Sequence, residues 1–370
     1  MKAIDSLIVS YRERVVGQLS LSPARGGVCA FEYDAHWIAD GFSISPLELP
    51  LRGGVFEAKP QPFYGNFGIF EDSMPDGYGR YLLHKALKAS GINDAELSPL
   101  DRLSIIGEGG MGALTYRPVN KVVEREQCAD LDMLQQKALA VLSERSSEDA
   151  SLLLFNSGNS GGARPKAVMS DADGHWLVKF RHTYDAEDIG LVEYAYNEGA
   201  HRCGIEVPDF KLINGKYFAS RRFDISADGQ RIHTATAGAL LCVSLEMPTL
   251  DYRNLLALTG YLTGRQADVE QMFRRMLFNY LTDNKDDHCK NFSYYVGEDR
   301  RWHLAPAYDL TYNAEGYGGQ HATSINYTDN PSMADIQALA SKFGISPARC
   351  AAIYDEVLTG CGKLLRRPIC

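Results

Sequence analysis

The residues best suited to chemistry in this sequence lie between Asp286 and Asn291. These two are five positions apart, with Asp287, His288 and Lys290 between them. Transfer of a phosphoryl group from ATP needs a carboxylate that orients and deprotonates the attacking hydroxyl group, and an oxygen ligand that holds Mg²⁺ against the phosphates. One loop with this spacing supplies both. The alternative is a solvated polar loop, but apolar segments flank this one on both sides, which favours a position close to the core.

A second acidic residue, Asp309, follows Asn291 by 18 positions. The residues between them are predicted to form a hairpin, and two strands joined by a turn return the chain to its starting point. We therefore expect Asp309 to lie near Asn291. Hard cations such as Mg²⁺ bind oxygen ligands, so the pair predicts a metal site. The alternative is an aspartate that caps a turn.

Lys179 lies in the apolar run HWLVKF, which is predicted to be a strand. A lysine in such a strand either extends to solvent or meets an anion. In kinases, a lysine in this place contacts the α- and β-phosphates of ATP and is held by an acid on the next helix. That helix is predicted at 189–203. It carries two candidates, Glu193 and Glu198, of which we favour Glu193.

The small-residue segment SGNSGGARPK, from Ser157 to Lys166, is a candidate phosphate loop. Backbone amides of small residues can approach phosphate oxygens closely. The segment is not a Walker A loop, because it lacks the G-x-x-x-x-G-K-[ST] pattern. The alternative is a flexible linker.

Composition narrows the classes of function. The net charge of −9 over 370 residues argues against a protein that mainly coats nucleic acid. Eight scattered cysteines without a C-x-x-C pair fit reduced thiols in the cytoplasm better than a disulfide scaffold. The first residues lack the apolar core of a signal peptide, and no run of about 18 apolar residues predicts a membrane span. A cytoplasmic protein without a membrane partner is expected.

Three segments are expected to position the candidate residues. Strand-like runs dominate residues 1–120, two hairpins and a helix occupy residues 121–255, and helices dominate residues 256–370. A strand-rich lobe followed by a helical lobe is the order found in kinases. The predicted fold is therefore α+β: a kinase-like two-lobed core preceded by a small β-rich N-terminal subdomain.

Local patterns predict the individual elements. Apolar residues recur at i, i+3, i+4 and i+7 from Val269 to Leu281, which predicts a helix shortly before the candidate loop. Turn residues and glycines predict hairpins that turn at 12–14, 173–174 and 214–215, a strand at 28–33, and helices at 77–91 and 189–203. The charged stretch 121–147 is predicted to be helical, and it either links two domains or covers an edge.

Taken together, these segments resemble the HipA family of serine/threonine kinases, the toxins of bacterial toxin–antitoxin pairs. The resemblance runs through nearly the whole chain. VVGQLSLS, FEDSMPDGYGR and DRLSIIGEGGMGALTYRP are similar to the family's N-terminal subdomain, and GGARPK, LVKF and RRFD to its ATP-binding lobe. The most specific motifs are DDHCKNFS and PAYDL.

The resemblance implies a role for each matching residue. Asp286 would be the catalytic base, His288 and Lys290 would support the catalytic loop, and Asn291 and Asp309 would bind Mg²⁺. The implied ATP contacts are Lys179 with Glu193, the loop residues Ser160, Gly161, Gly162 and Ala163, and the segment 220–223 with Arg221 and Phe223. A regulatory autophosphorylated serine of the family would correspond to Ser157 or Ser160.

The resemblance also implies ATP and Mg²⁺ as cofactors, a cellular protein as phosphate acceptor, and a small helix-turn-helix antitoxin through which the chain would meet DNA indirectly. By family analogy, the acceptor would belong to the translation machinery, such as an aminoacyl-tRNA synthetase. Two alternatives stay open. One is an ATP-binding corepressor that works mainly through its partner, and the other is a kinase of small molecules.

Overall fold

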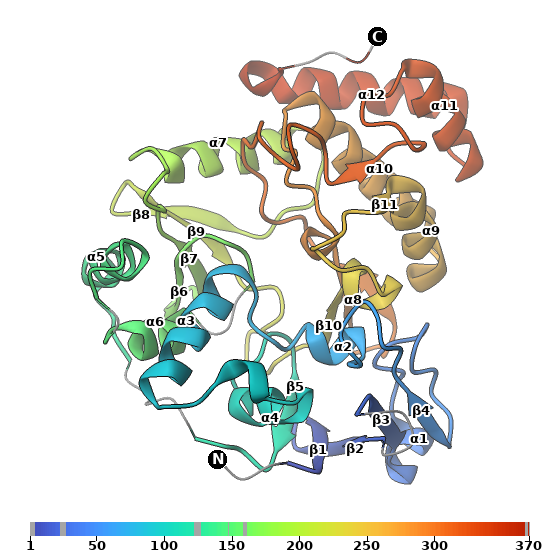
Figure 1. Ribbon diagram of the computed structural model, residues 1–370. Coiled ribbons are helices and arrows are strands. Elements are labelled where there is room, and N and C mark those ends of the chain that lie inside the picture. The colour runs from blue at the N-terminus through green and yellow to red at the C-terminus, as the bar shows by residue number, and fades with distance from the viewer. Residues whose placement is uncertain are drawn as a thin grey trace. The chain divides into compact units, whose positions relative to one another are not determined.

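The computed structural model describes residues 4–22, 27–121, 127–146, 148–157, 161–366 and 369 (Figure 1). The chain separates into two compact units. Unit 1 comprises Met1–Gly190 and Ile213–Ala235, and unit 2 comprises Leu191–Leu212 and Thr236–Cys370. Both contain helices and strands. The three-segment division expected from the sequence stays a prediction. Within the described part of the chain, no helix combines the length and the apolar character needed to cross a membrane.

Unit 1 contains most of the strands. Its elements are β1 (Ser6–Tyr11), β2 (Arg14–Leu21), β3 (Cys29–Tyr33), α1 (Ala35–Asp40), β4 (Val55–Glu57), α2 (Gly68–Glu71), α3 (Gly77–Ala89), η2 (Asp94–Glu96), α4 (Pro99–Ile106), β5 (Leu114–Arg117), α5 (Leu131–Leu142), α6 (Ala150–Ser157), β6 (Lys166–Asp171), β7 (Gly174–Lys179) and β9 (Tyr217–Arg221). The chain passes between the units at α7 (Ile189–Arg202), β8 (Phe210–Ile213) and β10 (Thr234–Thr236).

The first sheet of unit 1 has the strand order β4-β3-β2-β1-β5. β1 and β2 are joined by a turn at Arg12 and Glu13, whose φ angles are both positive (47° and 65°). Tight hairpin turns require this backbone conformation. Leu7 and Val9 are fully buried, because alternate side chains of a strand face the same side. The predicted hairpin and the strand predicted at 28–33 are confirmed.

The second sheet contains β6, β7 and β9 in antiparallel register. Alternate side chains on these strands are apolar and pack against α3, α5 and α6. This core includes Leu82, Leu134, Ala138, Leu153, Trp176, Val178, Tyr217 and Ala219. The predicted turns are confirmed by positive φ angles at Gly174 (140°), Asn214 (53°) and Gly215 (68°).

Several helices of unit 1 differ from the sequence prediction, and α1 and α2 are among those that were not predicted. α4 was not predicted, although its capping box of Ser98 and Asp101 is legible in the sequence. α6 occupies residues expected to lead into the small-residue loop, so Ser157 is the last residue of a helix. α5 lies within the predicted helical stretch 121–147, and its buried leucines belong to the core rather than to a linker.

His233 makes a pH-dependent contribution to the stability of unit 1. The residue is 1% exposed, its ring packs against Tyr11 and Phe42, and its Nε2 lies 2.9 Å from the carbonyl oxygen of Ile44. Burial lowers the pKa of His233 from 6.5 to about 4. The folded protein therefore holds a neutral ring in the pH range where the unfolded chain takes up a proton.

We expect this one group to lower the free energy of unfolding by about 3 kcal/mol between roughly pH 7 and pH 4. The stabilisation is fully present above the unfolded pKa of 6.5 and is lost as the pH falls toward 4. Urea titrations of the wild type and of His233→Gln across this range measure the effect, since the variant should lack this part of the pH dependence. Equal pH dependence in both proteins would contradict the expectation.

Unit 2 is mostly helical. Its elements are α8 (Ala237–Leu241), β11 (Leu250–Asp251), α9 (Tyr252–Thr263), α10 (Gln266–Leu281), η3 (Cys289–Asn291), β12 (Ser293–Val296), β13 (Trp302–Leu304), β14 (Thr323–Ser324), α11 (Met333–Lys342), α12 (Pro347–Cys361) and η4 (Gly362–Leu364).

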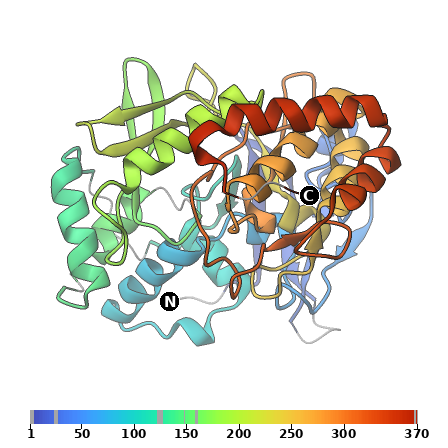
Figure 2. The ribbon, with the colours of Figure 1, turned by 90° about the horizontal axis from the view of Figure 1, so that it is seen from above.

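Helix α10 lies at the centre of unit 2. The predicted apolar stripe from Val269 to Leu281 is confirmed and buried. α9 packs against one side of α10, and α12 lies alongside it (Figure 2). Ion pairs join α10 to α12, one of them between Arg349 Nη2 and Glu270 Oε2 at 2.7 Å. The polar loop that follows α10 therefore starts from a buried, well-supported helix.

Candidate active site

The loop after α10 leaves the helix in a defined direction. The Thr282 hydroxyl donates to the carbonyl oxygen of Phe278 (2.7 Å), and Asp283 adopts the left-handed backbone conformation with φ 52°. Nδ2 of Asn284 then donates to Oδ1 of Asn279 on α10 (2.9 Å). These bonds end the helix and turn the chain toward the candidate catalytic residues.

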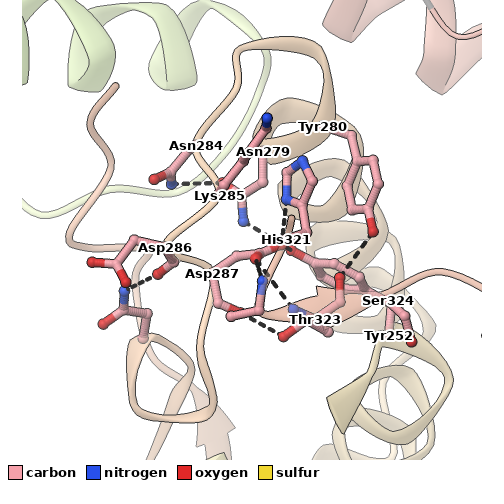
Figure 3. A network of polar contacts seen from close by, with 12 residues as sticks. Tyr252, Asn279, Tyr280, Asn284, Lys285, Asp286, Asp287, His321, Thr323 and Ser324 are labelled. Carbon is pink, nitrogen blue, oxygen red and sulfur yellow. Dashed lines mark hydrogen bonds and ion pairs between the residues drawn. The ribbon is translucent and has the colours of Figure 1, made fainter. Parts of the chain in front are cut away.

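Asp287 anchors this loop in the core of unit 2 (Figure 3). Its side chain is 0% exposed. Tyr252 Oη (2.9 Å) and His321 Nδ1 (3.0 Å) donate hydrogen bonds to Oδ2, and the amides of Ala322 (2.9 Å) and Thr323 (3.2 Å) donate to Oδ1. A buried carboxylate is stable only when it is paired or hydrogen-bonded. Asp287 therefore holds the loop in place and is not available to a substrate.

The side chains that bind Asp287, Tyr252 and His321, are fixed by contacts of their own. The Tyr252 hydroxyl oxygen accepts a hydrogen bond from Nδ2 of Asn279 (2.9 Å). The His321 ring stacks on Tyr280, with ring centroids 3.7 Å apart and planes inclined by 4°. Burial, together with the nearby charge of Asp287, raises the pKa of Tyr252 well above its ordinary value. The hydroxyl of Tyr252 therefore stays protonated and remains a donor.

Asp286 points away from this network and is accessible (Figure 3). Its side chain is 43% exposed. Nε2 of His288 lies 3.9 Å from Oδ1 of Asp286, which is too far for a direct hydrogen bond but close enough for electrostatic attraction when His288 is protonated. Of the two adjacent aspartates, only Asp286 can meet the hydroxyl group of a substrate.

Asn291 is tied to the same loop. Its Nδ2 donates to the carbonyl oxygen of Asp286 (2.7 Å), and its backbone amide donates to the carbonyl oxygen of His288 (2.9 Å). Because the amide nitrogen is used in this way, Oδ1 is the side-chain atom of Asn291 that can act as a ligand. Oxygen is the ligand type that Mg²⁺ prefers.

The hairpin predicted between Asn291 and Asp309 is confirmed, with β12 and β13 paired antiparallel. At its end, the Tyr308 hydroxyl donates to the carbonyl oxygen of Lys290 (2.6 Å). The chain therefore returns to the loop. Asp309 is the next residue and has a left-handed backbone conformation (φ 58°).

The supporting residues of the loop were missed by sequence reasoning. Tyr252 and His321 lie 35 and 34 positions from Asp287. No local spacing connects them, so only the folded chain shows that they meet. Asp287 is part of the motif, but its spacing alone indicates no role for it.

In unit 1, Lys179 lies directly opposite Lys166 in the register of β6 and β7. Directly opposed residues point to the same side of a sheet, here the side away from α3, α5 and α6. Nζ of Lys179 lies 5.9 Å from the ring centroid of Phe218. Two positively charged side chains therefore belong to this side of the sheet. Lys166 ends the predicted loop but was not among the predicted ATP contacts.

The predicted adenine segment lies at the end of β9. Arg221 is opposite Trp176 of β7. Arg222 and Asp224 form a buried ion pair, with Nε of Arg222 2.7 Å from Oδ1 of Asp224. This pair fixes the segment from within and leaves Arg221 and Phe223 partly exposed.

The structure describes only part of the predicted phosphate loop, residues 157 and 161–166. Residues 161–163 lie between α6 and β6 and are partly or fully exposed, whereas Ser160 lies outside the described residues. Ser157 is 1% exposed, and its Oγ donates to the carbonyl oxygen of Leu154 (2.9 Å). A phosphate could reach Ser157 only after the end of α6 opens. Autophosphorylation at Ser157 or Ser160 stays a prediction.

Helix α7 carries both acids considered as partners of Lys179. Glu193 is 2% exposed, whereas Glu198 is exposed. Carboxylates are seldom buried without a partner, which favours Glu193. Lys179 and Glu193 belong to different units, and their pairing stays a prediction.

Comparison with known proteins relates both ends of the chain to one family. Residues 158–364 match the family model of the HipA-like C-terminal domain, and residues 7–117 match that of the HipA N-terminal domain. The curated protein "Putative kinase Y4dM" of Sinorhizobium fredii is 26% identical over 195 residues, which cover 47% of this chain and 47% of that protein. The matched part thus spans about half the length of this relative.

One solved structure resembles nearly the whole chain. It comes from the complex of HipA, HipB and operator DNA of a Shewanella oneidensis MR-1 toxin–antitoxin system. The likeness has a TM-score of 0.72 at 17% identity and covers 98% of this chain and 92% of that one. It confirms the predicted fold class, an α+β kinase-like core that follows a β-rich N-terminal subdomain. The proinflammatory kinase CtkA of Helicobacter pylori covers 55% of this chain and 88% of its own at 13% identity, but its TM-score of 0.38 is too low to establish a shared fold.

Proposed function

The chain belongs to the HipA family, and on this basis we propose that it is a kinase that transfers the γ-phosphate of ATP to a serine or threonine of a cellular protein. The observation that carries the proposal is the geometry of the loop after α10. Asp286 is the accessible carboxylate of that loop, and Asn291 is bound to the main chain of Asp286 with its amide oxygen available as a ligand. Phosphoryl transfer needs a general base and a metal ligand in fixed positions, and this loop provides both.

In this proposal, Asp286 accepts the proton of the attacking hydroxyl group and orients its oxygen toward the phosphate. The oxygen atoms of Asn291 and Asp309 fit Mg²⁺, which would neutralise charge on the phosphates when bound. Among the described residues, no three or more His, Cys, Asp or Glu side chains cluster to hold a metal. A site with few protein ligands suits Mg²⁺, which usually keeps several waters.

ATP would be bound mainly by unit 1. Lys179 and Lys166, on the same side of the sheet, supply positive charge for the phosphates. The backbone amides of Gly161 and Ala163 would supply further donors. Arg221 and Phe223, the partly exposed residues of the segment after β9, would contact the adenine.

We further propose that the protein acts as the toxin of a toxin–antitoxin pair and binds a small helix-turn-helix partner. The solved relative from Shewanella oneidensis was obtained with HipB and operator DNA, which supports such a partner here. The net charge of −9 favours contact with DNA through the partner rather than directly. The acceptor would be a cytoplasmic component of translation, such as an aminoacyl-tRNA synthetase.

Label transfer from γ-labelled ATP to proteins of a cell lysate, in the presence of Mg²⁺, tests the proposed activity. We expect label on serine or threonine of at least one protein. Asn291→Ala should lower this label by roughly 100-fold, because it removes a ligand of the Mg²⁺ that would neutralise charge on the phosphates. Asn330→Ala changes an exposed asparagine outside the loop and should match the wild type. Label that appears only in small metabolites, or in no protein, would show that the proposal is wrong.

A further inference from the structure

Asp76 has an unusual role at the start of α3. It is the N-cap residue of the helix, yet its carboxylate makes no capping hydrogen bond to the helix. An N-cap aspartate ordinarily accepts from the second or third amide of its own helix. Asp76 is also only 5% exposed, so its carboxylate needs donors within the protein.

The carboxylate of Asp76 instead binds the glycine loop, defined here as residues 161–163. Its Oδ1 accepts a hydrogen bond from the amide of Gly162, 86 positions away. The amide of Tyr78 donates to the carbonyl oxygen of Gly162 (3.0 Å). Both main-chain polar groups of Gly162 are therefore bound to the beginning of α3. The position of the glycine loop thus depends on this helix.

Two glycines allow the close approach. Gly77 has φ 45°, and a Cβ atom there would lie 2.5 Å from the carbonyl oxygen of Gly162. A Cβ atom on Gly161 would lie 3.0 Å from Oδ1 of Asp76. A side chain at either position would push the loop away from the helix. The PDGYG motif near α3 and the GGARPK motif are therefore complementary in shape as well as in hydrogen bonding.

The glycine loop is also joined to a lysine proposed to meet the phosphates. Nζ of Lys166 donates to the carbonyl oxygen of Gly161, and Lys166 lies opposite Lys179. A shift of the loop would therefore disturb both its backbone amides and the contact of Lys166.

We propose that Asp76 is a positioning residue that docks the glycine loop onto α3 and thereby sets the affinity of the protein for the phosphate groups of ATP. The inference rests on the proposed function for the identity of the ligand. The docking of the loop is independent of it. A role through the loop predicts that loss of Asp76 affects ligands with phosphates and spares those without.

Two measurements on the full chain test this role. One is equilibrium binding of ATP and of adenosine, which lacks phosphates. The other is hydrogen exchange of the backbone amides at 161–163 in the ligand-free protein. Asp130→Ala is the matched control for Asp76→Ala, because Asp130 is the N-cap of α5 in the same unit and its Oδ1 accepts from the amide of Met133 (3.0 Å).

For Asp76→Ala we expect faster exchange at 161–163 and roughly tenfold weaker binding of ATP, the loss expected for one hydrogen bond to a charged group. Adenosine binding should be unchanged. Asp130→Ala should change neither. ATP affinity equal to that of the control would overturn the proposal, and so would tighter ATP binding, which would mean that the carboxylate competes with phosphate.

Two further outcomes are also decisive. If Asp76→Ala does not fold, Asp76→Asn is measured in the same way. This variant keeps the shape and one acceptor, so a smaller loss of ATP affinity in the same direction is expected. If the wild type binds neither ATP nor adenosine, the proposed function fails. The exchange data alone then decide whether Asp76 holds the loop.

Discussion

Replacement of Asp286 by Asn is expected to lower the rate of phosphate transfer from ATP by about 10²–10⁴-fold without a loss of folding stability. The amide keeps the shape of the carboxylate but cannot accept a proton at neutral pH. The side chain is 43% exposed, and it is the backbone carbonyl of Asp286 that holds Asn291. Exposed substitutions of this kind usually change the free energy of unfolding by less than about 0.5 kcal/mol.

Initial rates of label transfer from γ-labelled ATP to protein, at saturating ATP, measure this effect. Asp329→Asn is a matched control, because Asp329 is an exposed aspartate of the same unit outside the loop. It undergoes the same chemical change and should keep the wild-type rate. Thermal melting checks that both variants are folded. A wild-type rate in Asp286→Asn would show that Asp286 is not the base.

Replacement of Asp287 by Asn should act first on stability. We expect the free energy of unfolding to fall by about 1–3 kcal/mol, the cost of leaving buried donors unsatisfied. The carboxylate accepts hydrogen bonds from Tyr252, from His321 and from two backbone amides. An asparagine offers one oxygen and one NH₂ group. Two of the four donors would therefore face another donor.

Urea unfolding followed by circular dichroism measures this loss. Tyr252→Phe removes one of the four donors to Asp287, together with the acceptor of Asn279, but places no new donor against the network and should cost less, about 1 kcal/mol. A larger loss of unfolding free energy in Asp287→Asn than in Tyr252→Phe is the result expected if all four donors stabilise the fold through Asp287. An Asp287→Asn protein that unfolds at the wild-type urea concentration would show that the buried carboxylate does not stabilise unit 2.

Much of the fold was predictable because the elements concerned have strong local signals. The apolar stripe of α10, the turn residues of the β6–β7 hairpin and the glycine after α3 act over a few positions. The family resemblance inferred from DDHCKNFS and PAYDL was confirmed by the two domain matches. α6 was missed because its short apolar run has almost no amphipathic pattern and leads directly into glycines and serines.

The residue types of the candidate site were predictable from the sequence, but the contacts that hold its loops in place were not. The spacing of Asp286 and Asn291, and the hairpin that returns the chain to Lys290, follow from the order of residues. The pairing of Lys166 with Lys179 needed the register of two strands. The docking of the glycine loop on Asp76 joins residues 86 positions apart, which no motif of a few residues can specify.

The sequence by itself determined that two adjacent aspartates follow a helix with an apolar stripe, and that the first of them lies five positions before an asparagine. Only the tertiary structure decided that Asp287 is buried and that the side chain of Asp286 is exposed. The reason is that burial depends on the groups packed around a side chain. The side-chain donors to Asp287 are Tyr252 and His321, which lie 35 and 34 positions away and are brought together by α9, α10 and the segment before β14.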